Sequence, residues 1–185
     1  ILWSFKYYDV NTPDWHPRAP IINCNSPVFD GNRIYVTSGY NHTGVMLELN
    51  DDGSEAGLVW ADTILDTHHG GVVKVGNYIY GSNWINNGTG NWVCIDWTTG
   101  EKMWEEKWNS KGSVISVNDK LIISDEKRGF VGLAEATHEK FNLISSFKTP
   151  LGTGPYWAHP VIHEGVLYVR HNKALMAYNI TENAR

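Results

Sequence analysis

The chain reads Val75-Gly76-Asn77-Tyr78-Ile79-Tyr80 at its clearest tight turn and strand, and this pattern recurs along the sequence. The other copies are Asp30 to Val36, Val117 to Ile123 and His163 to Val169. Aligned on Tyr35, Tyr80, Ile122 and Tyr168, successive copies are 45, 42 and 46 residues apart. Gly and Asn tolerate the positive φ that a two-residue hairpin turn requires. The sequence therefore predicts a repeated unit that opens with a β-hairpin.

Each unit continues with two further apolar runs. The third runs are Val45 to Leu49, Trp92 to Trp97, Phe130 to Ala136 and Ala174 to Ile180. The fourth runs carry an aromatic residue and end at Trp60, Trp104 and Phe147. Four strands in roughly 40–45 residues is the blade period of a β-propeller. We therefore predict an all-β propeller of four-stranded antiparallel blades with about four blades present. A β-sandwich, the alternative, does not explain the regular return of the pattern.

The repeat divides the chain, which we treat as one partial propeller domain over residues 1–185. The apolar opening Leu2 to Phe5 resembles a fourth strand, so we assign 1–9 to the last strand of a preceding blade. The blades then cover 23–62, 68–108, 111–148 and 157–180, and the last one lacks its aromatic strand. The sequence allows three ways to complete the ring of blades: a four-bladed ring within the chain, a homodimer that forms one ring, or further blades outside this sequence.

Composition excludes several classes of protein. The chain has 185 residues, of which 42% are hydrophobic and 19% charged, with a net charge of −5, so it is not a disordered segment. No run of about 18 apolar residues is present, so we expect no membrane span. The acidic balance argues against a nucleic-acid partner. Cys24 and Cys94 lie too far apart for a metal-knuckle motif. The opening residues lack the basic start and the small-residue cleavage site of a signal peptide, so we expect the sequence to be a processed or excised piece of a longer chain.

The segment from Trp92 to Trp104 resembles the pyrroloquinoline-quinone-type propeller repeat. That repeat reads approximately small-Leu-Asp-x-x-Thr-Gly-Lys-x-x-Trp. Here Asp96 and Thr98 would cap a tight turn, Gly100 would take the positive φ, and Trp104 would pack on the neighbouring blade. The match is looser from Leu49 to Trp60. It is weakest in the third unit, where Phe147 stands in place of the Trp.

The resemblance implies a propeller of seven or eight blades in an exported, mostly bacterial family. The family includes quinoprotein alcohol dehydrogenases, which use pyrroloquinoline quinone and Ca²⁺, and non-catalytic members such as outer-membrane assembly lipoproteins. The dehydrogenases hold the quinone between a Trp and a disulfide of two adjacent Cys, and this chain has no Cys-Cys pair. We therefore favour a scaffold that binds a small molecule or a protein partner. A quinone-dependent alcohol or sugar dehydrogenase is the alternative.

The repeat also predicts which polar residues gather at one mouth of the propeller channel. The loop that enters the innermost strand and the loop between the second and third strands lie at the same end of each blade. The predicted ligand-binding residues at this mouth are His68, His69, Asn83, Lys111, Asp125, Trp157, His159, Arg170 and His171, and His42 maps to the same face.

Several chemistries are open for this group of residues. His68, His69 and His159 with Asp125 could bind a divalent metal. His69 or His159 could instead act as a general base, while Lys111 or Arg170 holds an anionic ligand. The side chains could also simply hydrogen-bond the loop backbones. If His68 and His69 lie on a strand, their rings point to opposite faces, which weakens joint metal ligation.

Overall fold

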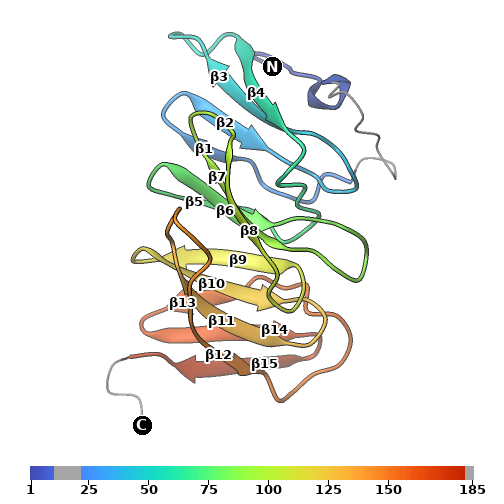
Figure 1. Ribbon diagram of the computed structural model, residues 1–185, viewed down its shortest axis with the longest axis vertical. Helices are drawn as coiled ribbons and strands as arrows, with labels where there is room; N and C mark the ends of the chain where they lie inside the picture. Colours follow the sequence, from blue (N-terminus) through green and yellow to red (C-terminus); the bar gives the residue numbers. More distant parts are fainter. Residues whose placement is uncertain (11–21, 182–185) are drawn as a thin grey trace.

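The computed structural model describes residues 1–10 and 22–181, which form antiparallel sheets stacked on one another (Figure 1). The first sheet contains β1 (Val28–Asp30), β2 (Arg33–Val36), β3 (Gly44–Leu49) and β4 (Ala56–Asp62). The second contains β5 (Val72–Val75), β6 (Tyr78–Ser82), β7 (Trp92–Asp96) and β8 (Lys102–Glu106). The third contains β9 (Gly112–Val117), β10 (Lys120–Asp125), β11 (Phe130–Glu135) and β12 (Leu143–Lys148). The fourth contains β13 (Val161–His163), β14 (Val166–His171) and β15 (Ala174–Asn179).

Within each sheet the strands follow one another in chain order, so every connection is a hairpin. The turn between β9 and β10 shows the chemistry: Asn118 and Asp119 have φ values of 46° and 56°. Two consecutive residues in the left-handed region match the twist of the flanking strands. This arrangement confirms the predicted all-β propeller fold, with three four-stranded blades and a fourth of three strands.

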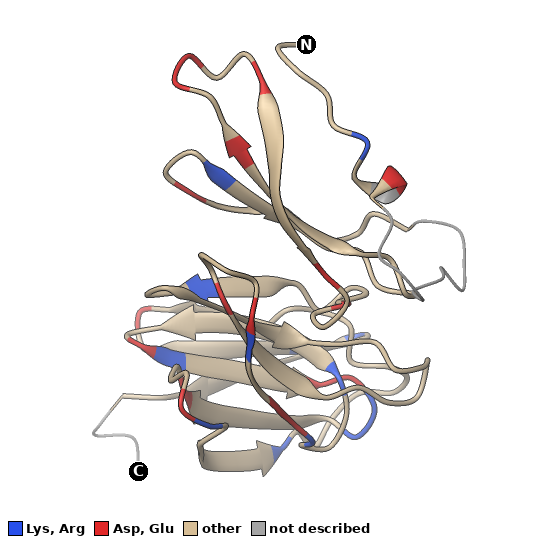
Figure 2. Ribbon diagram, turned by 45° about the horizontal axis from the view of Figure 1, so that its top comes forward, with Lys and Arg blue, Asp and Glu red and all other residues tan. Residues whose placement is uncertain are grey.

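The core lies between neighbouring sheets and follows the two-residue alternation of the strands. Leu121 and Ile123 of β10 are buried against the second sheet, among residues such as Tyr80 and Trp92. Ile122, between them in sequence, is buried against the fourth sheet. The interior of each inner sheet is therefore apolar on both faces. Charged positions lie mainly in turns and at strand ends (Figure 2).

An aromatic residue of the outermost strand crosses each junction between sheets. Trp60 of β4 donates its indole N–H to the carbonyl of Trp97, 3.3 Å away. Its ring lies against Gly100, where φ is 75° and a Cβ would come within 2.7 Å of the indole. Trp104 of β8 donates to the carbonyl of Thr137 at 2.8 Å. The predicted packing of Trp104 on the neighbouring blade is confirmed, and Trp60 packs between blades in the same way.

The third junction differs because Phe147 of β12 replaces the Trp. Its ring packs on Tyr178 of the fourth sheet with ring centroids 4.7 Å apart, but it has no N–H to donate. A cavity of about 510 Å³ lies beside it, and its walls include Val131, Leu133 and Leu167. The smaller ring leaves this junction less well filled than the other two.

The expected strand at the start of the chain is not formed. Residues 1–6 have no strand hydrogen bonding, and a short 3₁₀ helix, η1 (Tyr7–Asp9), follows them. A β-strand needs hydrogen bonds to a partner edge, and residues 1–6 pair with none of the described strands. The segment lies beside the first sheet, whereas β15 lies at the opposite end of the stack (Figure 1). It therefore does not complete the fourth blade within the same chain.

Among the residues that the structure describes, no helix is both long and apolar enough to cross a membrane.

Candidate functional site

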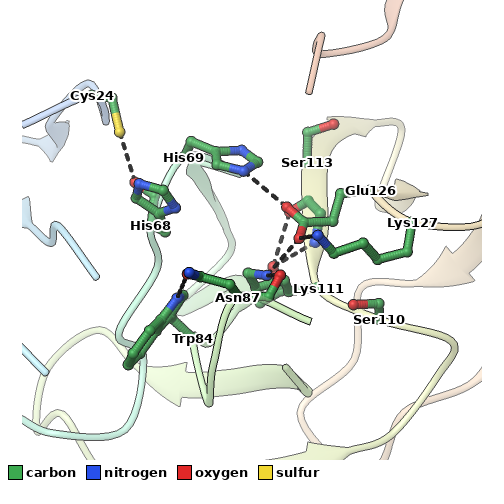
Figure 3. A network of polar contacts seen from close by, with 12 residues as sticks. Cys24, His68, His69, Trp84, Asn87, Ser110, Lys111, Ser113, Glu126 and Lys127 are labelled. Carbon is green, nitrogen blue, oxygen red and sulfur yellow. Dashed lines mark hydrogen bonds and ion pairs between the residues drawn. The ribbon is translucent and has the colours of Figure 1, made fainter. Parts of the chain in front are cut away.

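The mouth is the end of the stack where the loops between blades enter the innermost strands. At its centre lies the carboxylate of Glu126, which directly follows β10 and is 2% exposed in its side chain. Lys111, just before β9, donates Nζ–H to Glu126 Oε1. His69, in the loop before β5, places Nε2 at 2.8 Å from Glu126 Oε2, and Lys127 Nζ lies 3.3 Å from Oε1 (Figure 3). One buried carboxylate thus joins the loops of the second and third sheets.

The charges of this network stabilise one another. Burial alone would raise the pKa of Glu126, but the hydrogen bonds from His69 and Lys111 and the charge of Lys111 outweigh it and hold the pKa at about 2. Burial lowers the pKa of Lys111, and the hydrogen bond and charge of Glu126 oppose that change. Lys111 Nζ also donates to the carbonyl of Asn87 at 3.2 Å. The side chains leave no space for a ligand between them. This network therefore supports the mouth loops and is not itself a binding site.

His68 lies beside the network without entering it. Its ring lies between those of Tyr40 and His69, with centroids 4.4 and 4.8 Å away. Burial, followed by the electrostatic interactions with His69 and Lys111, lowers the pKa of His68 to about 4. The condition under which the two His rings would face opposite ways, a strand at His68 and His69, is not met. Residues 68–70 precede β5 and have no strand conformation, so the rings lie edge to face.

Three of the predicted site residues support the loops. Asn83 donates to Glu105 Oε1 at 2.9 Å and accepts the N–H of Asn91 at 2.8 Å. Asp125 accepts the N–H groups of Lys127 and Arg128 and so caps the turn after β10. His171 is 3% exposed, and its two ring nitrogens lie 2.8 and 2.6 Å from the carbonyl oxygens of Leu151 and Gly154. These contacts hold the mouth loops in place.

The remaining predicted residues are exposed. Trp157 is 59% exposed and its ring meets His69 edge to face, with centroids 5.6 Å apart. Arg170, on β14, donates Nε–H to the carbonyl of Asn172. A cavity of about 300 Å³ opens to solvent here, and its walls include Trp157, Ala158, Arg170 and Asn172. His159 is exposed and places Nε2 at 3.3 Å from the carbonyl of His69.

The structure thus brings together His68, His69, Lys111, Trp157 and His159, which sequence reasoning grouped at one mouth. It also shows the part played by Glu126, which the sequence analysis did not single out. Glu126 follows Asp125 directly, and the choice between the two carboxylates depends on the residue at which β10 ends.

The donor groups at the mouth are not arranged as a metal centre. No group of three His, Cys, Asp or Glu side chains able to hold a metal ion is found in residues 1–10 and 22–181. Cys24 and Cys94 are both free thiols. Cys24 donates its S–H to the carbonyl of His68, and burial raises the pKa of both thiols.

No protein-family model and no curated protein matches this chain. Solved structures do match. BamB from Moraxella catarrhalis superposes with a TM-score of 0.59 at 16% identity, over 83% of this chain and 41% of that one. A europium-containing methanol dehydrogenase superposes with a TM-score of 0.53 at 16% identity, over 76% of this chain and 27% of that one. The chain therefore spans less than half the length of either protein.

These likenesses concern backbone arrangement, because identity at this level carries no residue of the site from one protein to another. They agree with the stacked four-stranded sheets. The chain therefore has a β-propeller fold like that of these two solved structures.

Proposed function

We propose that this β-propeller is a scaffold that binds a ligand or a protein partner at its mouth. The observation that supports the proposal is the exposed Trp157 ring beside the Arg170 side chain, on a cavity of about 300 Å³. An indole face accepts planar or apolar groups, and a guanidinium pairs with carboxylates. We therefore expect the mouth to take an anionic planar group, borne by a small molecule or by a segment of a partner.

Two groups at the mouth, Glu126 and His68, are not suited to acid–base catalysis near neutral pH. A general acid or base works best when its pKa lies near the operating pH. The pKa of Glu126 is held at about 2, and that of His68 is lowered to about 4. Neither group changes its charge near neutral pH. Glu126 contacts His69, and His69 in turn contacts the Trp157 ring and the His159 side chain.

Benzoate, a planar carboxylate, is a suitable first probe. We expect it to shift the NMR signal of the Trp157 indole N–H in a saturable way, and Arg170→Ala to weaken this binding by about tenfold. Arg33→Ala is the matched control, because Arg33 pairs with Glu48 in the first sheet. An unchanged affinity in Arg170→Ala would show that the mouth is not the binding site.

A quinone-dependent alcohol dehydrogenase is the second candidate, favoured by the likeness to a methanol dehydrogenase. Trp157 and Arg170 suit a planar carboxylated quinone. The described residues do not fit a quinone–metal centre, because they offer neither an adjacent Cys pair nor a three-residue metal group. We therefore derive no catalytic step.

The two functions are separated by adding pyrroloquinoline quinone and Ca²⁺ to the protein. A scaffold is expected to give no dye-linked oxidation of alcohols. A bound chromophore together with Trp157-dependent alcohol oxidation would overturn the scaffold proposal in favour of the enzyme. An exported location follows from the same resemblance and is tested by fractionating the source cells.

A further inference from the structure

A second cavity, of about 230 Å³, lies at the junction of the first two sheets. Its walls come from the β2–β3 loop, the β4–β5 connection and the β6–β7 loop. The lining residues are Asn41, Thr63, Ile64, Asp66, Asn83, Trp84 and Ile85. None of them lines the cavity of Trp157 and Arg170, so the two are separate places on the molecule.

Asp66 is the only ionisable side chain among these lining residues, and it is only 2% exposed. Its Oδ2 accepts the backbone N–H of Asn41 at 2.8 Å. Its Oδ1 is buried and has no hydrogen-bond partner among the described residues. A buried carboxylate oxygen without a partner is costly, which indicates that a donor is missing at this place.

A tight turn of the β2–β3 loop faces Asp66. Tyr40 and Asn41 have φ values of 59° and 60°, and the N–H of His42 donates to the carbonyl of Gly39 at 3.2 Å, as in a two-residue turn. This turn directs the N–H of Asn41 at Asp66 Oδ2.

The charges near Asp66 favour a cation. Burial raises the pKa of Asp66 to about 7, and the negative charge of Asp62 contributes to this rise. No ion pair joins Asp66 to a basic side chain in the described part of the chain. The ring of His68 lies against Tyr40, and burial lowers its pKa to about 4, so it is neutral at pH 7. No Lys, Arg or His is among the described residues that line the pocket, so Asp66 has no basic partner on its walls.

Aromatic rings complete the environment. The Trp84 ring contacts the Tyr40 ring in a tilted arrangement, with centroids 4.8 Å apart. Its indole N–H is already bound to Asn87 Oδ1, so a ligand would meet the ring itself. Ring faces attract cations, and the attraction is largest for Trp.

We propose that this cavity binds the ammonium group of a small primary amine, with Asp66 as its counter-ion. The amine would donate to Asp66 Oδ1, and the hydroxyl of Thr63 and the carboxamide of Asn41 would take further hydrogen bonds. Trp84 and Ile85 would cover its carbon chain. A neutral alcohol could form the hydrogen bonds but would leave the carboxylate charge uncompensated.

The probes are n-propylammonium and 1-propanol, which have the same chain length and differ in charge. We expect n-propylammonium to shift the NMR signals of the Asn41 amide and the Trp84 indole N–H in a saturable way. The Asp66→Asn change should weaken this binding by about tenfold or more. Asp51→Asn, which changes an exposed carboxylate in the β3–β4 turn, and Trp157→Ala should leave it unchanged.

Three results would overturn the proposal: equal binding of 1-propanol, full affinity in Asp66→Asn, or shifts with K⁺ or Ca²⁺ but none with the amine. If Asp66→Asn does not fold, Thr63→Val decides, because it removes a proposed hydrogen-bond partner without changing the size of the side chain. We expect it to weaken amine binding severalfold, and an unchanged affinity would refute the site. Trp157→Ala changes the mouth and leaves the Asp66 cavity intact. Loss of amine binding can therefore be told apart from loss of ligand binding at the mouth.

Discussion

Glu126 shows how a single buried residue can organise loops that are distant in sequence. Its carboxylate contacts Lys111, His69 and Lys127, and it is almost inaccessible to solvent. A buried charge is tolerated only when oppositely charged partners surround it, and removing one partner leaves the others uncompensated. The mouth therefore depends on this residue for its shape.

We predict that Glu126→Gln lowers the free energy of unfolding by about 3–5 kcal/mol, because Lys111 then stays buried without a counter-ion. Urea denaturation followed by Trp fluorescence measures the change. Lys127→Met is the control, since that side chain is 40% exposed and should cost less than about 1 kcal/mol. Equal midpoints for Glu126→Gln and the unmodified protein would contradict the prediction.

Asp66 should have the opposite influence on stability. Its pKa rises from 3.8 to about 7 on folding, so the folded protein binds the proton more tightly than the unfolded chain. Stability from this group is complete below pH 3.8 and is lost as the pH rises through about 7. We predict that Asp66→Asn leaves stability unchanged near pH 4 and raises it near pH 8, by on the order of 1 to 4 kcal/mol.

The measurement is a series of urea denaturation curves from pH 4 to pH 8. The difference between Asp66→Asn and the unmodified protein should grow with pH. The control variant Asp51→Asn should show no such trend, because Asp51 is exposed. A constant difference at every pH would show that the Asp66 carboxyl does not titrate in this range.

At the scale of elements, the junctions between sheets differ in the aromatic residue that fills them. Trp60 and Trp104 combine apolar contact with one hydrogen bond each, whereas Phe147 supplies contact only. Burying aromatic area and satisfying a carbonyl both stabilise packed sheets. The third junction is therefore the weakest of the three in this respect.

We predict that Phe147→Trp stabilises the protein by about 1 kcal/mol, because the indole enters the cavity beside Phe147. Trp104→Phe should destabilise it by about 1–2 kcal/mol through the lost hydrogen bond and the space left behind. Thermal unfolding measures both changes. Phe29→Trp is the control, since Phe29 is 75% exposed and gains no buried contact. A loss of stability in Phe147→Trp would mean that the junction cannot accept a larger ring.

The fold was predictable from sequence because its determinants are local. Turn residues such as Asn118 and Asp119, and the alternation of Leu121, Ile122 and Ile123, act within a few positions of one another. The site was only partly predictable. Whether Asp125 or Glu126 enters the mouth depends on a one-residue difference in the end of β10, and His68 and His69 depend on where β5 begins. No sequence motif marks Asp66, because its burial is set by the tertiary structure and cannot be read from neighbouring residues.

At the scale of the whole molecule, the described sheets form an open stack. The fourth sheet ends at β15, and the outer face of the first sheet exposes Phe29 and Leu58. Open strand edges and apolar sheet faces associate readily. We propose that a second copy of this chain covers these surfaces and completes a ring, in keeping with the greater length of the solved propellers that match it.

Light scattering coupled to size exclusion tests this proposal. We expect a mass of twice the 20.9 kDa of one chain. Leu175→Glu, which places a charge on exposed apolar surface of β15, should restore the mass of a single chain. Lys148→Glu is the control. Lys148 lies on β12 of the third sheet, which is not at an end of the stack, so this change should leave the mass unchanged. A single-chain mass for the unmodified protein would refute the homodimer.

The aromatic residues at the junctions have a geometric consequence. Neighbouring innermost strands, β1 with β5 and β5 with β9, are in contact, while Trp60 and Trp104 separate the outer strands. The width of the outer side chain therefore fixes the rotation from one sheet to the next. A closed circle requires these rotations to add up to one full turn. Exchanging Trp for Phe at a single position, as at Phe147, is thus a means by which sequence can alter the curvature of the stack and the number of sheets that closes it.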